Sequence, residues 1–302
     1  MVIAHHRAAP PRARVPESEG YMSSLRHGPV RGAPMRFSDW EGYYDAIVKS
    51  MNYSRDRDEQ VAWMLSGMME SRASQLAHIS DLKDIFRGRH AYVFADGPSL
   101  ASDIVDFPFT RPTVAADGAT SKMMDEGIRP DVIVTDLDAE RVEDQVEANR
   151  QGSIVVIHAH GDNQRALEEW VPRFPGRILA STQAAPIKNV HDFGGFTDGD
   201  RAVLLADHFG SDPLILVGFN FDEGDAEYVR SLGEIKLKKL AWGSAIIINL
   251  TRGQLYFFED VAQQLRDGAV ALAAAGGGGG AGNGAAAPRA GSGDGGAAGD
   301  PE

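Results

Sequence analysis

Short apolar runs that each end at a polar or glycine-containing turn recur along the middle of this chain. They are rich in valine, isoleucine and alanine, which is typical of strands buried on both faces of a parallel sheet. Segments with helical character separate them, and strand–helix alternation predicts right-handed crossovers. We therefore predict an α/β fold with a mostly parallel, doubly wound sheet. The expected strands begin at Tyr92, Thr113, Val132, Ile154, Ile178 and Leu214, and the expected helices cover 98–106, 120–126, 140–150, 162–171 and 200–209.

Four parts of the chain are expected from composition and periodicity. Residues 1–34 are rich in Arg, Pro, Ala and Gly without a period, and we expect a disordered extension. Residues 35–88 are predicted to form an N-terminal helical subdomain, with a first helix opened by a capping box at 38–41 and a broken second stretch over 56–86. Residues 89–268 form the predicted α/β catalytic domain with C-terminal helices over 225–265, where 255–258 is ambiguous. Residues 269–302 are a Gly/Ala-rich flexible tail.

Charge and composition remove several classes of function. The formal net charge is -13, and a surface of that sign disfavours nonspecific binding to nucleic acid or to anionic membranes. The sequence has no cysteine, so it has no disulfide, thiolate nucleophile or Cys-ligated metal site. No apolar stretch approaches the roughly 20 residues needed to span a bilayer. These features favour a protein of a reducing, cytoplasmic compartment that acts on small molecules.

Carboxylates gather at the predicted strand ends, where an open parallel sheet binds its ligands. Asp136 and Asp138 end one strand, Asp117 ends the preceding strand, and Asp162 follows the next. Paired carboxylates suit Mg²⁺, which takes oxygen ligands and keeps waters that can exchange for substrate phosphates. An isolated Asp-x-Asp also fits a helix cap beside a solvated carboxylate. We take Asp136, Asp138 and Asp162 as the candidate catalytic and metal-binding residues, and we rank Asp117 after these three.

Two further segments carry candidate binding groups. His158 and His160 lie in a glycine-containing turn without the spacing of a zinc site, so they fit substrate contact or structural hydrogen bonds. The loop 193–200 combines glycines, aromatic rings and carboxylates, and its amides are suited to phosphate. The chain lacks the Walker A motif, the dinucleotide fingerprint and the nucleophile elbow.

The ordered set of these motifs resembles the archaeal 6-hydroxymethyl-7,8-dihydropterin diphosphokinases of the MptE type over about residues 35–250. The segments that carry the resemblance are 97–100, 116–119, 127–138, 158–163, 195–202 and the lysine-rich run 236–240. That family is in turn similar to thiamine diphosphokinases, whose Asp-x-Asp matches Asp136 and Asp138 and whose following loop matches 161–162. The chain departs from the family's usual Gly-x-Gly turn at 95–97, so the phosphate contact of that turn is not carried over in detail.

The resemblance implies Mg²⁺-dependent transfer of diphosphate from ATP to the hydroxymethyl oxygen of a reduced pterin, giving AMP, in tetrahydromethanopterin or folate biosynthesis. ATP and the reduced hydroxymethylpterin would be the partners, without nucleic acid or membrane, and a homodimer stays open. Lys188, Arg201 and 236–239 are candidates to pair with phosphate, and Asp198 or Asp200 to bind the pterin's amino-pyrimidine edge. The residues implied in cofactor and substrate binding are Gly97, Ser99, Asp117, Gly118, His158, His160, Asn163, Thr197, Asp198, Asp200 and Arg201.

Three alternatives remain open from the sequence. One is the same transfer to another alcohol, such as thiamine. Another is the nucleotide-sugar-binding role of related MptE-like domains in bacterial proteins linked to flagellin glycosylation. The third is a nucleotide-binding module without catalysis. The number of metal ions and the choice between the two biosynthetic pathways are also left open by the sequence.

Overall fold

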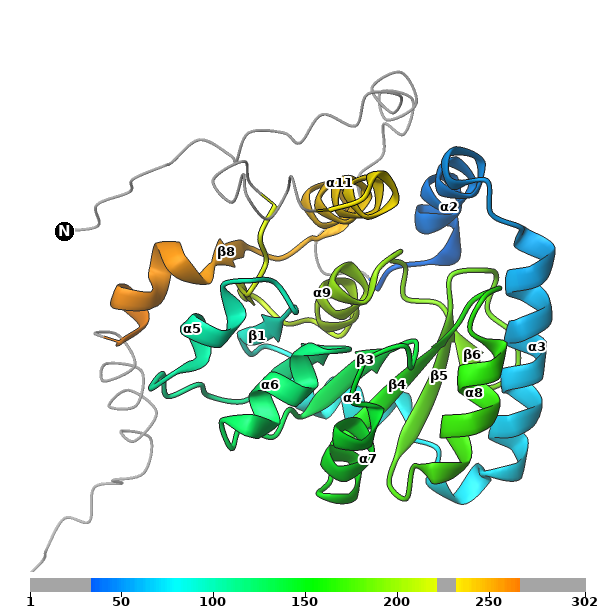
Figure 1. Ribbon diagram of the computed structural model, residues 1–302, viewed down its shortest axis with the longest axis horizontal. Helices are drawn as coiled ribbons and strands as arrows, with labels where there is room; N and C mark the ends of the chain where they lie inside the picture. The colour runs from blue at the N-terminus through cyan, green and yellow to red at the C-terminus, as the bar shows by residue number, and fades with distance from the viewer. Residues whose placement is uncertain (1–33, 222–231, 267–302) are drawn as a thin grey trace, which may run out of the picture. The chain divides into compact units, whose positions relative to one another are not determined.

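The computed structural model describes residues 34–221 and 232–266, which contain a single sheet of eight parallel strands (Figure 1). The strand order is β6-β5-β4-β3-β2-β1-β7-β8. This confirms the α/β class and the parallel sheet expected from the sequence. The strands are β1 (Ala91–Phe94), β2 (Thr113–Ala116), β3 (Val132–Thr135), β4 (Ile154–Ala159), β5 (Ile178–Thr182), β6 (Val190–His191), β7 (Leu214–Val217) and β8 (Leu255–Phe257).

Helices cover both faces of the sheet. The described helices are α2 (Phe37–Met51), α3 (Arg55–Ser71), η1 (Ala73–Gln75), α4 (Ile79–Phe86), α5 (Leu100–Ile104), α6 (Ala119–Asp125), α7 (Val142–Arg150), α8 (Gln164–Trp170), η2 (Val171–Arg173), α9 (Asp198–His208) and α11 (Glu234–Leu250). From β1 to β6 each strand is placed beside the previous one, and α9 then carries the chain back so that β7 pairs with the other side of β1. Helix α9 therefore lies on the opposite face from α6 and α7 (Figure 1).

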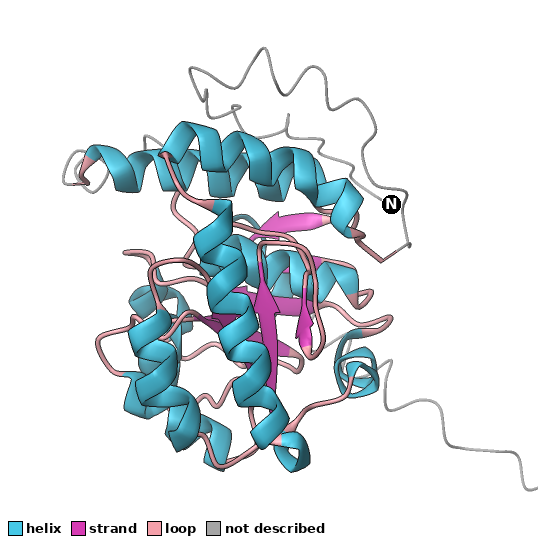
Figure 2. Cartoon of the chain, turned by 90° about the vertical axis from the view of Figure 1, so that its right-hand side faces the viewer, coloured by secondary structure: helices cyan, strands magenta, loops and turns pink. Residues whose placement is uncertain are grey.

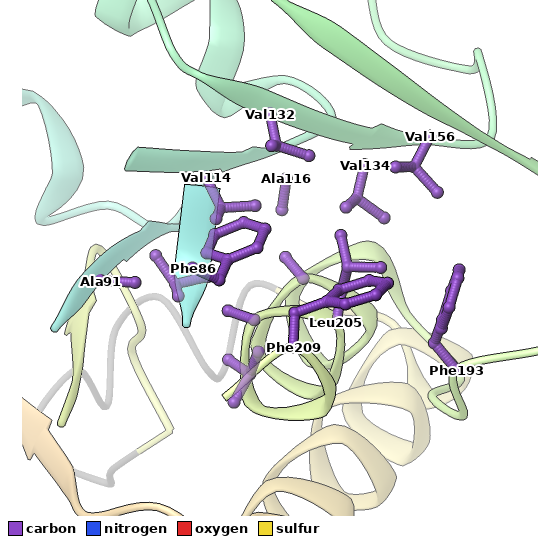
Figure 3. Close-up of a cluster of buried hydrophobic side chains, with 14 of the residues drawn as sticks. Phe86, Ala91, Val114, Ala116, Val132, Val134, Val156, Phe193, Leu205 and Phe209 are labelled. Atoms are coloured by element: carbon purple, nitrogen blue, oxygen red, sulfur yellow. The ribbon is translucent and has the colours of Figure 1, made fainter. Parts of the chain in front are cut away.

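The main core lies between the sheet and helices α4 and α9. Alternate strand residues face these helices, because successive side chains of a strand point to opposite faces. Figure 3 shows Val114, Val132 and Val134 turned toward Leu205 and Phe209 of α9. Buried residues from the central strands pack against α9 in this layer. This packing holds α9, and with it the groups at its N-terminus, in a fixed position.

A second apolar cluster joins α2 and α11 to α9. Trp40 and Tyr44 of α2 pack with Trp242 and Ile246 of α11 and with Leu204 of α9. The indole N–H of Trp40 also donates to the main-chain oxygen of residue 183, at 2.8 Å, beyond the end of β5. Helix α3 packs against β4, β5 and β6, and Figure 2 shows the helices as a group around the strands. These contacts bring the N-terminal helices next to the carboxyl ends of the strands.

Several details differ from the sequence expectations. Helix α2 begins at Phe37, because the Asp39 carboxylate accepts the main-chain N–H of Arg36 at 3.1 Å; the capping box at 38–41 was therefore wrong by two residues. The break expected in 56–86 is present, between α3 and α4. Strand β6 was not predicted, and 255–257 proves to be a strand. The expected extension and tail lie outside the described residues, except for residue 34. No described helix combines the length and apolar character needed to cross a bilayer.

Candidate functional site

Three carboxylates meet at the carboxyl ends of β2 and β3. Asp117 follows β2, and Asp136 and Asp138 follow β3. One oxygen of each lies within 4.8 Å of one oxygen of the other two. Adjacent parallel strands end at the same edge of the sheet, which is why residues that lie some twenty positions apart in the sequence come together.

The backbone around these carboxylates adopts two unusual conformations. Asp117 has φ 42° and Leu137 has φ 68°, in the left-handed region that non-glycine residues rarely occupy. Thr135 fixes both turns, since its hydroxyl donates to Asp117 Oδ1 at 2.7 Å and accepts the Leu137 N–H at 2.9 Å. The turn buries the Leu137 side chain, and the carboxylates on either side of it remain beside Asp117.

The charges of this cluster are poorly balanced by the protein alone. Burial raises the pKa of Asp117 to about 7, and the charges of Asp136 and Asp138 act in the same direction. Burial and the charge of Asp136 also raise the pKa of Asp138. Burial opposes ionisation of Asp136 as well, but the His160 hydrogen bond and the Arg201 charge hold its pKa down at about 2.

The donor set fits a divalent cation. Asp136 Oδ1 is buried and has no hydrogen-bond partner among the described residues. Like charges so close together repel one another unless a cation lies between them. Carboxylate oxygens are the ligands that Mg²⁺ prefers. A bound cation would give Asp136 Oδ1 a partner and would offset the repulsion among the three side chains.

His160 faces the cluster from the turn after β4. Its Nδ1 accepts the Asp162 main-chain N–H at 3.3 Å, so the ring proton of the neutral imidazole lies on Nε2. Nε2 lies 3.2 Å from Asp136 Oδ2 and donates to it. Asn163 holds this turn in place: its amide donates to the main-chain oxygens of Asp136 and His158 and accepts the His160 N–H. The Asn163 side chain therefore makes structural hydrogen bonds within the protein.

The N-terminus of α9 contributes a buried acid–base pair. Arg201 donates to Asp198 Oδ1 at 3.1 Å, and its guanidinium charge also acts on Asp136. Burial and the charge of Asp136 raise the pKa of Asp198, although Arg201 opposes this. Asp200, two residues further on, caps α9 by accepting from Phe196 N–H, Thr197 N–H and the Thr197 hydroxyl. Asp198 therefore belongs to the charged cluster, whereas Asp200 and Thr197 form a helix cap.

A cavity of about 250 Å³ opens beside Asp136. It lies between the connection from α2 to α3, the turn after β4, the segments around Gln183 and Phe196, and Lys239 of α11. Asp162 is on its wall, with its side chain 66% exposed and 3.5 Å from Arg57; it is not brought together with the three clustered carboxylates. The residues that line the cavity are Asn52, Tyr53, Ser54, Arg57, Asp58, Asp136, His160, Gly161, Asp162, Gln183, Phe196, Arg201 and Lys239.

Asp58 ties the walls of this cavity together. Its carboxylate accepts from Tyr44 Oη at 2.6 Å, from the Gly161 N–H at 2.7 Å and from Gln183 Nε2 at 2.8 Å. Gln183 in turn accepts from Arg201 Nη2 at 3.3 Å. A hydrogen-bonded chain therefore runs from the N-terminal helices to the arginine beside the carboxylates.

The other predicted residues lie elsewhere along the strand ends. The Gly97 N–H donates to the Gly218 oxygen at 3.1 Å, and Ser99 donates to Asn220 Oδ1, just beyond the paired ends of β1 and β7. This is the topological switch point of the sheet, a place where such folds bind ligands. Gly118 lies against the side chain of Asp96, whose carboxylate pairs with Lys122 at 2.7 Å.

His158 and Lys188 are among the predicted polar residues that do not line the cavity. His158 is buried beside Ser181 Oγ, 3.1 Å from its Nδ1, and burial lowers the pKa of this histidine far below its usual value. Lys188 is exposed and pairs with Glu70. Of the lysine run on α11, Lys239 lines the cavity.

The cavity residues supplied by α3 and by the connection from α2 to α3 were not predicted. The connection Asn52-Tyr53-Ser54 and the first turn of α3 do not end a strand, so the strand-end pattern could not reveal them. The one local signal is Asn52, which ends α2 in a left-handed conformation with φ 56°. Asparagine is among the residues that favour this position at a helix end, so a sharp change of direction could have been predicted there.

Comparisons with known proteins agree with the motif resemblance. The family model described as "6-hydroxymethylpterin diphosphokinase MptE-like" matches residues 68–226. The chain is 35% identical over 231 residues to the 6-hydroxymethyl-7,8-dihydropterin pyrophosphokinase of Methanocaldococcus jannaschii, which covers 70% of this chain and 95% of that protein. It is 41% identical over 188 residues to the protein of the same name from Pyrococcus furiosus, covering 62% of this chain and 79% of that one.

Among solved structures, the MAf glycosyltransferase from Magnetospirillum magneticum AMB-1 aligns with a TM-score of 0.34 and 14% identity. The alignment covers 55% of this chain and 28% of that chain.

Proposed function

The chain belongs to the MptE-like family, and on that premise we propose that it transfers diphosphate from ATP to 6-hydroxymethyl-7,8-dihydropterin, giving the pterin diphosphate and AMP. The relatives named pyrophosphokinase support the class of reaction, that of a diphosphotransferase. The observation that carries the proposal within this chain is the group of three carboxylates beside a polar cavity of about 250 Å³.

Mg²⁺ is the proposed metal, held by Asp117, Asp136 and Asp138. When bound, it would neutralise charge on the phosphate oxygens and orient them for attack. Asp162 is left out of the proposed ligand set, because its exposed side chain faces Arg57 and does not lie in the cluster. This revises the set expected from the sequence, in which Asp162 took the place that Asp117 now has.

The chain's own cations would bind and hold the polyphosphate. Arg201 is buried and fixed by Asp198 and Gln183, so its charge is preorganised. Lys239 lines the cavity on the side of Asp138 and is free to follow the substrate. Diphosphoryl transfer depends mainly on positioning and on electrostatic stabilisation, to which the fixed charge of Arg201 and the mobile charge of Lys239 would both contribute. His160 would keep Asp136 ionised and oriented.

The proposal is tested with Asp136→Asn and Asp138→Asn, assayed for AMP formation with the reduced pterin, ATP and Mg²⁺. We expect each to lose at least about a hundredfold in rate, the scale of removing one preorganised charge-stabilising group. Mn²⁺ binding, measured by electron paramagnetic resonance without substrate, should weaken in parallel. Asp125→Asn is the matched control, because it removes an exposed carboxylate that pairs with Arg141 away from the cavity lining.

Near-normal turnover in both variants would remove the metal assignment. Formation of ADP in place of AMP by the unaltered protein would refute diphosphate transfer. Running the same assay with thiamine tests the alternative acceptor, and preference for thiamine would refute the pterin assignment.

A further inference from the structure

The cavity is built partly from segments outside the range that the family model matches. Tyr53, Arg57, Asp58 and Lys239 lie outside residues 68–226, whereas the clustered carboxylates lie within it. Asp136 is the one member of that cluster on the cavity wall. Most of the cavity is therefore lined by residues other than the proposed metal ligands. The chemistry of these residues indicates which ligand the cavity binds.

One side of the cavity is aromatic. The ring centroids of Tyr53 and Phe196 lie 6.1 Å apart with 49° between the planes. At that angle the two rings cannot enclose a flat ligand between parallel faces, so they make a single wall on which one face of a heterocycle can stack. Tyr53 lies near Asp162, whose charge, after burial, raises the pKa of the tyrosine.

The adjoining side offers an acid and a base that are free to exchange partners. Arg57 Nη1 and Asp162 Oδ1 are 3.5 Å apart, and the two side chains are 64% and 66% exposed. Exposed pairs of this kind contribute little to stability, so a ligand can replace the contact at small cost. Asp58, by contrast, is buried and already accepts three hydrogen bonds.

The pair matches the edge of a 2-amino-4-oxopyrimidine ring. That edge presents two adjacent donors, the 2-amino group and N3–H, followed by an acceptor, O4. A carboxylate accepts from both donors at once, and a guanidinium donates to the acceptor. Adenine presents one amino donor beside an acceptor nitrogen, so a carboxylate there would leave one oxygen unpaired. The chemistry of the wall therefore favours the acceptor ring over the base of ATP.

The size of the cavity agrees with this choice. At about 250 Å³ it is just below the range of roughly 300–1,000 Å³ that is typical for drug-sized ligands. A bicyclic ring suits such a space better than an entire nucleoside triphosphate does. Asp136 on the wall would then place the hydroxymethyl end of that ring next to the proposed metal ligands.

We propose that this cavity binds the 2-amino-4-oxopyrimidine ring of the acceptor, with Asp162 recognising its amino and N3–H donors and Tyr53 stacking on its face. The inference rests on the proposed function and names the acceptor site within it. It replaces the expectation that Asp198 or Asp200 recognises the pterin edge, since Asp198 is paired with Arg201 and Asp200 caps α9.

Asp162→Asn is the main test, with steady-state kinetics varied separately in each substrate. We expect KM for the reduced pterin to rise about 10-fold to 100-fold, the discrimination carried by one bidentate contact to a base edge. KM for ATP should stay within about twofold. Asp125→Asn again serves as the control, since it breaks another exposed Asp–Arg pair. Tyr53→Leu should also raise KM for the pterin and leave KM for ATP unchanged, which makes the test independent of the carboxylate.

A second measurement separates this inference from the proposed reaction. Oxidised 6-hydroxymethylpterin is titrated into nucleotide-free protein and followed by its own fluorescence, with guanosine and adenosine as competitors. We expect binding that Asp162→Asn weakens and that guanosine displaces better than adenosine. If the unaltered protein shows this binding but forms no AMP, the proposed reaction fails and the cavity assignment stands.

Three results would overturn the cavity assignment. The first is normal turnover with an unchanged KM for the pterin in both variants. The second is a rise in KM for ATP in place of the pterin, which would assign the cavity to the nucleotide. The third is absence of pterin binding, or better displacement by adenosine than by guanosine.

Discussion

Asp58 joins three parts of the molecule, and its replacement by asparagine tests whether the N-terminal helices set the geometry around Asp136. The carboxylate is 3% exposed and accepts from Tyr44, Gly161 and Gln183 at 2.6–2.8 Å. Gly161 is in the turn that carries His160, and Gln183 holds Arg201. His160 and Arg201 both act on Asp136, so replacing Asp58 should disturb Asp136 through each of them.

The magnitude follows from the hydrogen bonds that asparagine cannot make. A hydrogen bond to a charged partner contributes about 1.5–3 kcal/mol. If the asparagine oxygen keeps the Gly161 N–H, its amino group meets the donors of Tyr44 and Gln183. The tyrosine hydroxyl can turn and accept, but the Gln183 amide has to flip, and Arg201 Nη2 then loses its acceptor. We expect Asp58→Asn to lower the free energy of unfolding by about 2–4 kcal/mol, and Tyr44→Phe, which removes one donor, by about 1–2 kcal/mol.

Urea unfolding of both variants and of the double variant checks these values. The double-mutant cycle should give a coupling above about 0.5 kcal/mol, because the two side chains share one hydrogen bond. Asp58→Asn should also lower kcat more than Tyr44→Phe does, because Asp58→Asn alone disturbs Arg201. A loss of stability below about 0.5 kcal/mol in Asp58→Asn, or equal kcat in the two variants, would refute this reasoning.

Two other predictions concern stability alone. Burial raises the pKa of Asp192 to about 8, so the charged carboxylate is disfavoured in the folded state, and stability should fall as pH rises from about 4 to 8. Asp192→Asn should therefore raise the melting temperature at pH 8.5 and have little effect on it at pH 4. An equal effect at the two pH values would contradict this assignment. A Cβ on Gly97 would lie 2.2 Å from the Gly218 oxygen, so Gly97→Ala should cost about 1–3 kcal/mol in denaturant unfolding. Gly67→Ala, in an open position on α3, should stabilise by about 0.5–1 kcal/mol, and the same sign for both variants would count against the steric argument.

The strands were predictable where the hydrophobic pattern was long enough. The runs that became β1 to β5 and β7 are rich in Val, Ile, Leu and Ala, and a strand buried on both faces needs such a run. Strand β6 has two residues and β8 has three, so neither carries a pattern that differs from a loop. The parallel order then followed from the alternation of strands and helices.

The candidate site was predictable at the level of residue type but not of role. Asp198 and Asp200 look alike in the sequence, yet one joins the charged cluster and the other caps α9. The spacing of Thr197 and Asp200 is that of a capping box, so local rules could have set Asp200 apart. No local rule could place Tyr53 or Arg57 beside the strand ends, because their position depends on how α2 and α3 pack against the sheet.

The conformations of Asp117 and Leu137 also bear on what the site is for. Each left-handed non-glycine residue costs on the order of 1–2 kcal/mol, and three carboxylates held together add electrostatic repulsion. A fold selected for stability alone would place glycine or asparagine at these turns. Thr135 instead bonds to both turns and holds the unfavourable arrangement in one geometry. Strain that is fixed by a dedicated side chain, beside a buried carboxylate oxygen of Asp136 that has no hydrogen-bond partner among the described residues, supports the proposal that this cluster is a binding site.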